Sequence, residues 1–210
     1  LEQKEKKRMV KSTITGKEQL TIYETKFIGS IMKPTIVCLV GDSGSGKTLA
    51  SLHLQEVLNW NSIVSYTTRK KREGEVNGKE HWFVTDKDVP EKSNMCAYTM
   101  FGGYQYWTEW EQFVSDKINV YVIDEKGLID LQAKEQTPFS FHLVTIKINR
   151  QHKDGIDKQR IARDEERVHI PEELYDYVIN NDYSIEAFRA TLYLIGKCIE
   201  RKYNNGSTKR

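Results

Sequence analysis

A glycine-rich stretch near the start of the chain has the residue pattern of a polyphosphate-binding loop. It follows the apolar run 35–40 and leads into a helical pattern. Its glycines allow successive backbone N–H groups to point into one concavity, and the dipole of the following helix adds positive potential there. The loop matches GxxxxGK[ST] in full, with Gly41, Asp42, Ser43, Gly44, Ser45, Gly46, Lys47 and Thr48. We therefore expect this loop to bind the phosphates of ATP.

Two side chains at the end of this loop carry the expected chemistry. The Lys47 ammonium would lie on the β- and γ-phosphates and act in catalysis, and the Thr48 hydroxyl would occupy one coordination position of Mg²⁺. The alternative is a Gly/Ser turn followed by a helix whose lysine is merely solvated. The complete motif directly after an apolar strand favours the phosphate site.

A second basic segment, Arg69-Lys70-Lys71-Arg72, lies about twenty residues further along the chain. Guanidinium groups bind phosphate dianions bidentately, so Arg69 and Arg72 are candidates for holding a second phosphate group. Taken alone, the tetrapeptide is also compatible with a solvated basic turn, and the match of the surrounding residues favours the phosphate clamp.

The sequence around these arginines is similar to that of a known enzyme family. From Ser65 to Val84 it reads SYTTRKKREGEVNGKEHWFV, which resembles the acceptor-phosphate segment of guanylate kinases. The resemblance continues at 101–108, 120–127 and 175–182, and it covers roughly residues 34–200. It implies an ATP-dependent kinase that transfers the γ-phosphoryl group to a nucleoside monophosphate, with Mg²⁺ as the cofactor.

The same resemblance implies which side chains bind the acceptor. They are Ser65, Arg69, Arg72, Glu75, His81, Tyr106, Thr108 and Asp124. Asp124 is also a second candidate ligand for the metal beside Thr48.

A further group of arginines falls in the segment that forms a mobile lid in this family. Arg160, Arg163 and Arg167 are spaced at i, i+3 and i+7, which places them on one face of a helix. Arg160 is the best positional match to a catalytic lid arginine, Arg163 is a second candidate, and Arg150 is another because the lid is shortened. The interleaved acids 164–166 equally suit a salt-bridged surface helix.

The chain departs from the family pattern at four positions near the acceptor. Ala97 stands where the family has a glutamate that accepts hydrogen bonds from guanine, a loss of about 1–3 kcal/mol for a buried donor. His81 replaces a tyrosine, and we expect it to titrate near neutral pH. Val122 replaces one carboxylate of an Asp-x-Asp pair, and Trp107 replaces a glycine and would add bulk beside the pocket. A compensating acid could come from Glu109, Glu111 or Asp124.

These departures leave the acceptor open. One alternative is a kinase of another small phosphate, such as a ribose bisphosphate. The other is a non-catalytic guanylate-kinase-like binding module, whose relatives lack a working phosphate loop. The intact Gly46-Lys47-Thr48 favours an enzyme.

The order of apolar and amphipathic segments predicts the elements that hold these residues. Their alternation indicates an α/β fold, a three-layer P-loop domain with a central parallel sheet covered by helices on both faces. Expected strands are 35–40, 62–68, 81–85, 97–101, 119–124, 140–148 and 176–180. Expected helices are 46–58, 109–117, 126–134, 156–169 and 184–201. Short strands and glycine turns between 62 and 108 predict a small, mostly antiparallel inserted sub-domain.

We divide the chain on this basis into a charged N-terminal extension, 1–33, a kinase-like domain, 34–201, and a disordered tail, 202–210. Within the domain we expect a core of 34–60 and 109–201, an acceptor sub-domain of 61–108 and a lid of about 150–170. The extension has no assigned role; docking of a nucleic acid or of another subunit is a weak alternative.

Charge and cysteine content limit the partners and the compartment. The chain has 32 basic and 30 acidic residues, and eight of the basic but four of the acidic ones fall in 1–33, so the domain itself is near neutral. This near-neutral charge argues against nucleic acid as the main partner. We expect no membrane span and no secretory or transit segment, because no long apolar run is present. Three widely spaced cysteines suit a reducing, cytoplasmic location. No pattern indicates an oligomeric state.

Overall fold

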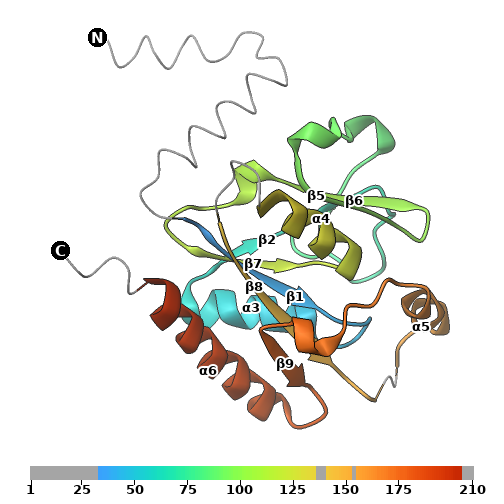
Figure 1. The fold of residues 1–210 in the computed structure, drawn as a ribbon. Helices are drawn as coiled ribbons and strands as arrows, with labels where there is room; N and C mark the ends of the chain where they lie inside the picture. The colour runs from blue at the N-terminus through green and yellow to red at the C-terminus, as the bar shows by residue number, and fades with distance from the viewer. Residues whose placement is uncertain (1–32, 136–140, 153–154, 205–210) are drawn as a thin grey trace, which may run out of the picture.

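The computed structural model describes residues 33–135, 141–152 and 155–204 (Figure 1). The predicted extension, apart from Lys33, and the last six residues of the predicted tail lie outside these ranges.

The centre of the molecule is a sheet of five parallel strands in the order β2-β7-β1-β8-β9. The strands are β1 (Thr35–Val40), β2 (Asn61–Ile63), β7 (Ile118–Val122), β8 (His142–Asn149) and β9 (Tyr177–Asn180). All six residues of β1 are buried, as expected for an apolar run in the middle of a parallel sheet. The phosphate loop leaves the carboxyl end of β1, the edge of such sheets where ligands bind.

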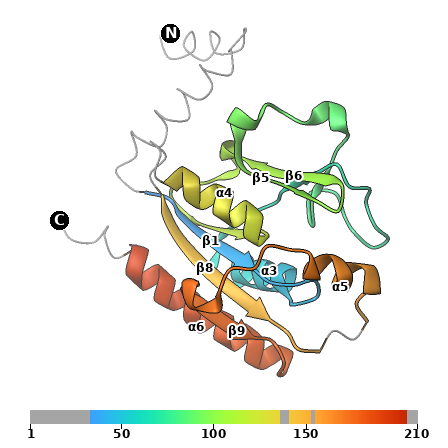
Figure 2. The ribbon, with the colours of Figure 1, turned by 45° about the vertical axis from the view of Figure 1, so that its right-hand side comes forward.

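Helices cover both faces of this sheet (Figures 1 and 2). They are α3 (Lys47–Leu58), α4 (Glu125–Glu135) and α6 (Ile185–Asn204), while α5 (Lys158–Glu165) lies apart from the sheet, beyond the carboxyl ends of its strands (Figure 1). Val37 and Leu39 pack in one core cluster with residues of α3 and α6. The alternate residues Ile36 and Cys38 pack in a second cluster with residues of α4 and of the smaller sheet. This period of two along β1 gives the layered arrangement.

A smaller sheet of four strands lies beside the central one, in the order β4-β3-β6-β5. Its strands are β3 (Tyr66–Thr67), β4 (Trp82–Phe83), β5 (Met95–Phe101) and β6 (Tyr104–Glu109). The β3–β6 and β5–β6 pairs are antiparallel and β3–β4 is parallel. The predicted α/β class, with a parallel sheet and a mostly antiparallel second sheet, is therefore confirmed.

Three elements differ from the predictions. The predicted strand 62–68 is two strands in different sheets, β2 and β3, so residues 61–63 belong to the central sheet. The predicted helix 109–117 is wrong, because Glu109 ends β6 and only one 3₁₀ turn follows. The predicted helix 156–169 is shorter, since α5 ends at Glu165. The 3₁₀ turns are η2 (Asp86–Asp88), η3 (Lys92–Asn94), η4 (Trp110–Gln112) and η5 (Glu172–Leu174).

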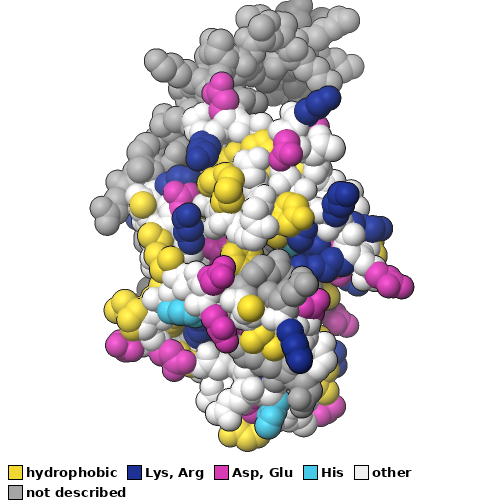
Figure 3. Space-filling model, turned by 90° about the vertical axis from the view of Figure 1, so that its right-hand side faces the viewer, with side chains coloured by type: hydrophobic (Ala, Val, Ile, Leu, Met, Phe, Trp, Pro, Cys, Tyr) yellow, Lys and Arg dark blue, Asp and Glu magenta, His cyan; other side chains and the backbone are white. Residues whose placement is uncertain are grey.

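Two whole-surface features bear on the expected partners. No helix in the described ranges has the length and apolar character required to span a membrane. Figure 3 shows basic and acidic side chains intermixed on the face that it presents, instead of a broad surface of one sign.

Candidate active site

The phosphate loop takes its shape from glycine. Gly41 and Gly46 have φ angles of 153° and 102°, in a region that side chains rarely adopt. A Cβ on Gly46 would also come within 2.6 Å of the amide nitrogen of Asn181, and one on Gly41 would run into the carbonyl oxygen of Ile148. The loop backbone therefore packs directly against neighbouring segments, and Asn181 holds it further by donating to the carbonyl of Ser45 at 2.8 Å.

Lys47 curls back over this loop. Its Nζ donates to the carbonyl oxygens of Gly41 and Asp42 at 2.7 and 2.6 Å. Burial, and next the nearby charge of Arg167, lower the pKa of Lys47 to about 8. The ammonium thus lies inside the concavity of the loop, where a point charge can meet phosphate oxygens.

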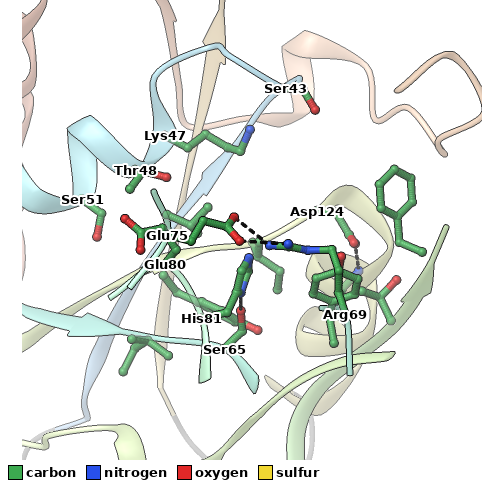
Figure 4. Close-up of a pocket in the computed structure, with 18 of the residues that line it drawn as sticks. Ser43, Lys47, Thr48, Ser51, Ser65, Arg69, Glu75, Glu80, His81 and Asp124 are labelled. Carbon is green, nitrogen blue, oxygen red and sulfur yellow. Dashed lines mark hydrogen bonds and ion pairs between the residues drawn. The ribbon is translucent and has the colours of Figure 1, made fainter. Parts of the chain in front are cut away.

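A cavity of about 430 Å³ opens in front of the loop, and residues of both predicted subsites line it. Figure 4 shows Lys47 and Thr48 on one side of it and Arg69, Glu75 and His81 on the opposite side. The described residues contain no cluster of three or more His, Cys, Asp or Glu side chains that could hold a metal by themselves. A site with one or two protein oxygen ligands still fits Mg²⁺, because this ion keeps several waters and takes substrate phosphates as ligands. Thr48 and Asp124 both line the cavity.

Six of the predicted acceptor residues line the cavity opposite the loop: Ser65, Arg69, Arg72, Glu75, His81 and Tyr106. Arg69 is 6% exposed and makes two parallel hydrogen bonds to the carboxylate of Glu75, at 2.9 and 2.8 Å. It also bonds the Tyr106 hydroxyl. The backbone N–H of Arg72 donates to Glu75 at 2.7 Å, and its guanidinium remains 40% exposed beside the cavity. Glu75 therefore fixes the direction of Arg69, which leaves Arg72 the more accessible cation.

His81 lies next to this pair and is neutral at physiological pH. Its Nδ1 is 2.9 Å from the Ser65 hydroxyl. Burial, and next the charge of Arg69, lower the pKa of His81 to about 4. The expectation that His81 titrates near neutral pH is therefore wrong, because it rested on the pKa of a solvated imidazole.

Asp124 and Thr108 lie on different sides of the cavity wall. Asp124 follows β7, lines the cavity, and accepts a hydrogen bond from the Gly127 N–H at 2.7 Å. Burial raises its pKa. Thr108 is fully buried, and its hydroxyl is bonded to the Tyr121 hydroxyl at 3.1 Å and the Cys96 thiol at 3.3 Å. The structure therefore places Asp124 at the cavity and Thr108 behind its wall.

Ala97 lines the cavity as expected, but Trp107 does not crowd it. Successive residues of β6 point to opposite faces, so Tyr106 faces the cavity while Trp107 packs on Tyr66 with ring centroids 5.4 Å apart. The Trp107 Nε1 donates to Glu109 at 3.2 Å, and neither of these two side chains lines the cavity. The expected bulk of Trp107 beside the pocket is wrong for this reason.

The predicted lid arginines separate in space. Arg160 lines the cavity. Its charge lies near Arg72, whose pKa is held below the ordinary value by burial first and then by the charges of Arg69 and Arg160. Arg150 is exposed and donates to the carbonyl of Gly44 at 3.1 Å. Arg163 lies in α5, and its side chain is outside the described part of the structure.

The cavity also contains residues that the sequence patterns did not single out. Glu80, Thr99 and Phe101 line it. Asp164, which sequence reasoning treated only as a surface acid, is buried against the phosphate loop. No local pattern distinguishes this aspartate from the adjacent glutamates, because its burial depends on where α5 docks.

The fold and cavity define the class of P-loop phosphotransferases. A family model described as guanylate kinase matches residues 32–193, so the chain belongs to the guanylate kinase family.

Individual relatives agree with this assignment. The chain is 30% identical over 178 residues to a guanylate kinase of Protochlamydia amoebophila, a match that covers 77% of this chain and 89% of the relative. It is 31% identical over 165 residues to a guanylate kinase of Wolbachia pipientis, covering 70% and 82%. The crystal structure of guanylate kinase from Anaplasma phagocytophilum shares the fold with a TM-score of 0.60 at 22% identity, covering 82% of this chain and 87% of that one.

Proposed function

We propose that this chain transfers the γ-phosphoryl group of ATP to the phosphate of a nucleoside monophosphate in the cytoplasm. The observation that supports this most is the placement of Lys47 and of the Arg69–Arg72 cluster across one cavity. A donor phosphate at Lys47 and an acceptor phosphate at these arginines would face each other across the cavity. The free thiols of the described cysteines suit a reducing compartment.

Catalysis in this site consists of positioning and charge stabilisation. The loop amides and Lys47 hold the donor phosphates. Arg72 and Arg69, oriented by Glu75, hold the acceptor dianion, with the Tyr106 and Ser65 hydroxyls and neutral His81 as neighbours. Arg160 approaches from the lid side. Mg²⁺, bound through Thr48 with Asp124 nearby, would supply charge neutralisation on the donor phosphates.

We propose further that the acceptor includes GMP but that the preference for guanine is weak. The relatives named above are guanylate kinases, which supports GMP as an acceptor. Ala97 supplies no hydrogen-bond acceptor from its side chain at the cavity wall, and Glu109 bonds Trp107 instead. A site discriminates between bases through polar groups that the wrong base leaves unpaired, and such a group is lacking at Ala97.

The test is Mg²⁺-dependent phosphotransfer by the parent chain and by Lys47→Ala, followed as nucleoside diphosphate formed. We expect turnover by the parent with at least one nucleoside monophosphate, and loss of about 100-fold or more in Lys47→Ala because a charge on the β- and γ-phosphates is removed. An exposed arginine far from the cavity, Arg201, provides the control Arg201→Ala. Equal turnover by Lys47→Ala and the parent would contradict the donor site, and binding of monophosphates without turnover would favour a binding module.

A further inference from the structure

Arg167 lines the cavity, and it lies outside the helix that its spacing from Arg160 predicts. Spacing places it on one helix face with Arg160, yet α5 ends at Glu165 and a turn closed by the Arg167 N–H and the Asp164 carbonyl follows. This turn directs the Arg167 side chain inward. Its side chain is 14% exposed, and it lines the same cavity as the phosphate loop.

Three contacts hold the guanidinium at the junction of the two subsites. Nη2 pairs with Asp164 at 3.0 Å, and Nη1 donates weakly to the carbonyl of Gly41 at 3.4 Å. The guanidinium carbon lies 4.4 Å from the ring centroid of Phe101, a residue of the acceptor side. Its charge acts on groups of both subsites: it helps to lower the pKa of Lys47, and at Asp124 it opposes the increase in pKa that burial causes.

Arg167 also retains donors for a ligand. Its Nε is buried without a hydrogen-bond partner among the described residues, and a guanidinium has five N–H groups in total. A buried N–H without a hydrogen-bond partner destabilises the folded chain, so its retention beside a phosphate site calls for a partner of high charge. Arg69, the other well-buried arginine of the cavity, has both ends of its fork committed to Glu75.

Asp164 fixes this arrangement. Its side chain is 2% exposed, Oδ2 accepts the Ser43 N–H at 2.6 Å, and Oδ1 lies 3.2 Å from the Ser43 hydroxyl. One carboxylate therefore joins the phosphate loop to Arg167. A surface salt bridge would not be buried in this way.

We propose that Arg167 is the catalytic guanidinium that contacts the transferring phosphoryl group, and that Asp164 is its positioning residue. This inference rests on the proposed phosphotransfer. In that step the bond from the γ-phosphorus to the bridging oxygen of ATP breaks, a bond to an acceptor phosphate oxygen forms, and ADP leaves with the bridging electron pair. Arg167 lies where its N–H groups can meet the equatorial oxygens as this charge is redistributed.

The experiment measures kcat, KM for both substrates, and the Kd of ATP for the parent, Arg167→Ala, Arg167→Lys, Asp164→Asn and the control Arg201→Ala. We expect kcat of Arg167→Ala to fall at least about 100-fold with ATP affinity changed only a few-fold, because the contact strengthens in the transition state. Arg167→Lys, which keeps the charge and is the variant to use should the alanine form not fold, should also lose most of kcat because it lacks the fork. Asp164→Asn should lower kcat about tenfold with KM for the acceptor unchanged.

Guanidinium ion added below denaturing concentration separates a chemical role from a structural one. It should restore part of the turnover of Arg167→Ala and have no such effect on the parent. If the parent transfers phosphate and Arg167→Ala does so within threefold of it, the role of Arg167 is overturned while the proposed function stands. Loss of ATP binding in proportion to turnover, or no rescue by guanidinium, would overturn it too. If the parent transfers no phosphate, both fall together.

Discussion

Neighbouring residues set the orientation and the protonation state of several side chains in this cavity. Arg69 has a direction because Glu75 accepts from both ends of its fork, and Asp164 acts on the loop only because α5 buries it. His81 is neutral because it is buried next to Arg69. A single substitution here therefore removes a charge and also releases the neighbouring side chain that this charge holds in place.

The first prediction concerns the acceptor clamp. Arg69→Ala and Arg72→Ala should each lower kcat/KM for the acceptor. The decrease should correspond to about 1.5–3 kcal/mol of lost transition-state stabilisation, the value of a charge-assisted hydrogen bond. Their ATP affinity should stay close to that of the parent. Steady-state kinetics with the acceptor varied at saturating ATP measures the effect, and Arg201→Ala is the control. Weaker ATP binding with acceptor use unchanged would exchange the two subsites.

The second prediction concerns base selectivity. Without an acceptor at Ala97, kcat/KM for GMP should exceed that for other nucleoside monophosphates by less than about tenfold. Ala97→Glu should raise the preference for GMP, and Ala97→Val, which adds volume at the same buried position but no hydrogen-bond acceptor, should not. Comparison of kcat/KM for GMP, dGMP, AMP, CMP, UMP and dTMP decides this. A roughly thousandfold preference of the parent for GMP, worth about 4 kcal/mol, would mean that another group accepts from guanine.

Among the elements, those fixed by local pattern were predictable and those fixed by docking were not. β1, the loop and α3 follow from an apolar run, glycines and a helix start that lie next to one another in sequence. The helix predicted over 109–117 failed because Trp110 and Phe113 are buried in a core cluster, which an extended strand with one 3₁₀ turn allows. The predicted length of α5 is wrong for a related reason. A turn after Glu165 brings Arg167 to the cavity, and this tertiary contact is not visible in the residue spacing.

Much of the candidate site was nevertheless accessible from sequence. The loop and the Arg69 segment are contiguous motifs, so the sequence alone identifies their residues. Their facing positions across the cavity, the burial of Thr108 and the direction of Trp107 depend on which side of a strand faces the core. That alternation could be resolved only once β6 had been paired with β5.

The third prediction concerns a buried ion pair that fastens α4 to β8. Lys147 donates to Glu125 at 2.7 Å, and the two side chains are 10% and 2% exposed. Lys147→Met should lower the free energy of unfolding by about 3–5 kcal/mol because it leaves a buried carboxylate uncompensated. The double variant Lys147→Met with Glu125→Gln should recover most of that loss.

Urea denaturation measures these differences at constant m-value. The exposed pair Lys197–Glu200 supplies the control, since Lys197→Ala should cost less than about 1 kcal/mol. A double variant no more stable than Lys147→Met alone would show that the lost stability comes from packing and not from the stranded charge.

For the molecule as a whole, stability should fall as the pH is lowered through the range where an exposed histidine titrates. The pKa of His81 is about 4 in the folded chain, below the ordinary 6.5, so the unfolded chain takes up this proton first. The contribution is fully present above pH 6.5 and is lost progressively down to about pH 4. From pH 7 to 5 this one group should cost about 2 kcal/mol of unfolding free energy.

His81→Asn isolates that contribution. Its unfolding free energy should decrease less than that of the parent between pH 7 and 5, and the difference should approach about 2 kcal/mol. The exposed His152 provides a matched control, His152→Asn, which should follow the parent. Parallel pH profiles for the parent and His81→Asn would show that His81 titrates alike in both states.

The lowered pKa of Lys47 should couple ATP binding at the loop to the uptake of protons. With a pKa of about 8, the free chain holds a partly deprotonated amine at slightly alkaline pH. Polyphosphate favours the ammonium and raises that pKa, so binding of ATP near pH 8 should draw up to about half a proton from the buffer. The calorimetric enthalpy of ATP binding should then vary with the ionisation enthalpy of the buffer, and the affinity should weaken as the pH rises above 8. In Lys47→Arg, whose side chain stays protonated, the buffer dependence attributable to this residue should vanish.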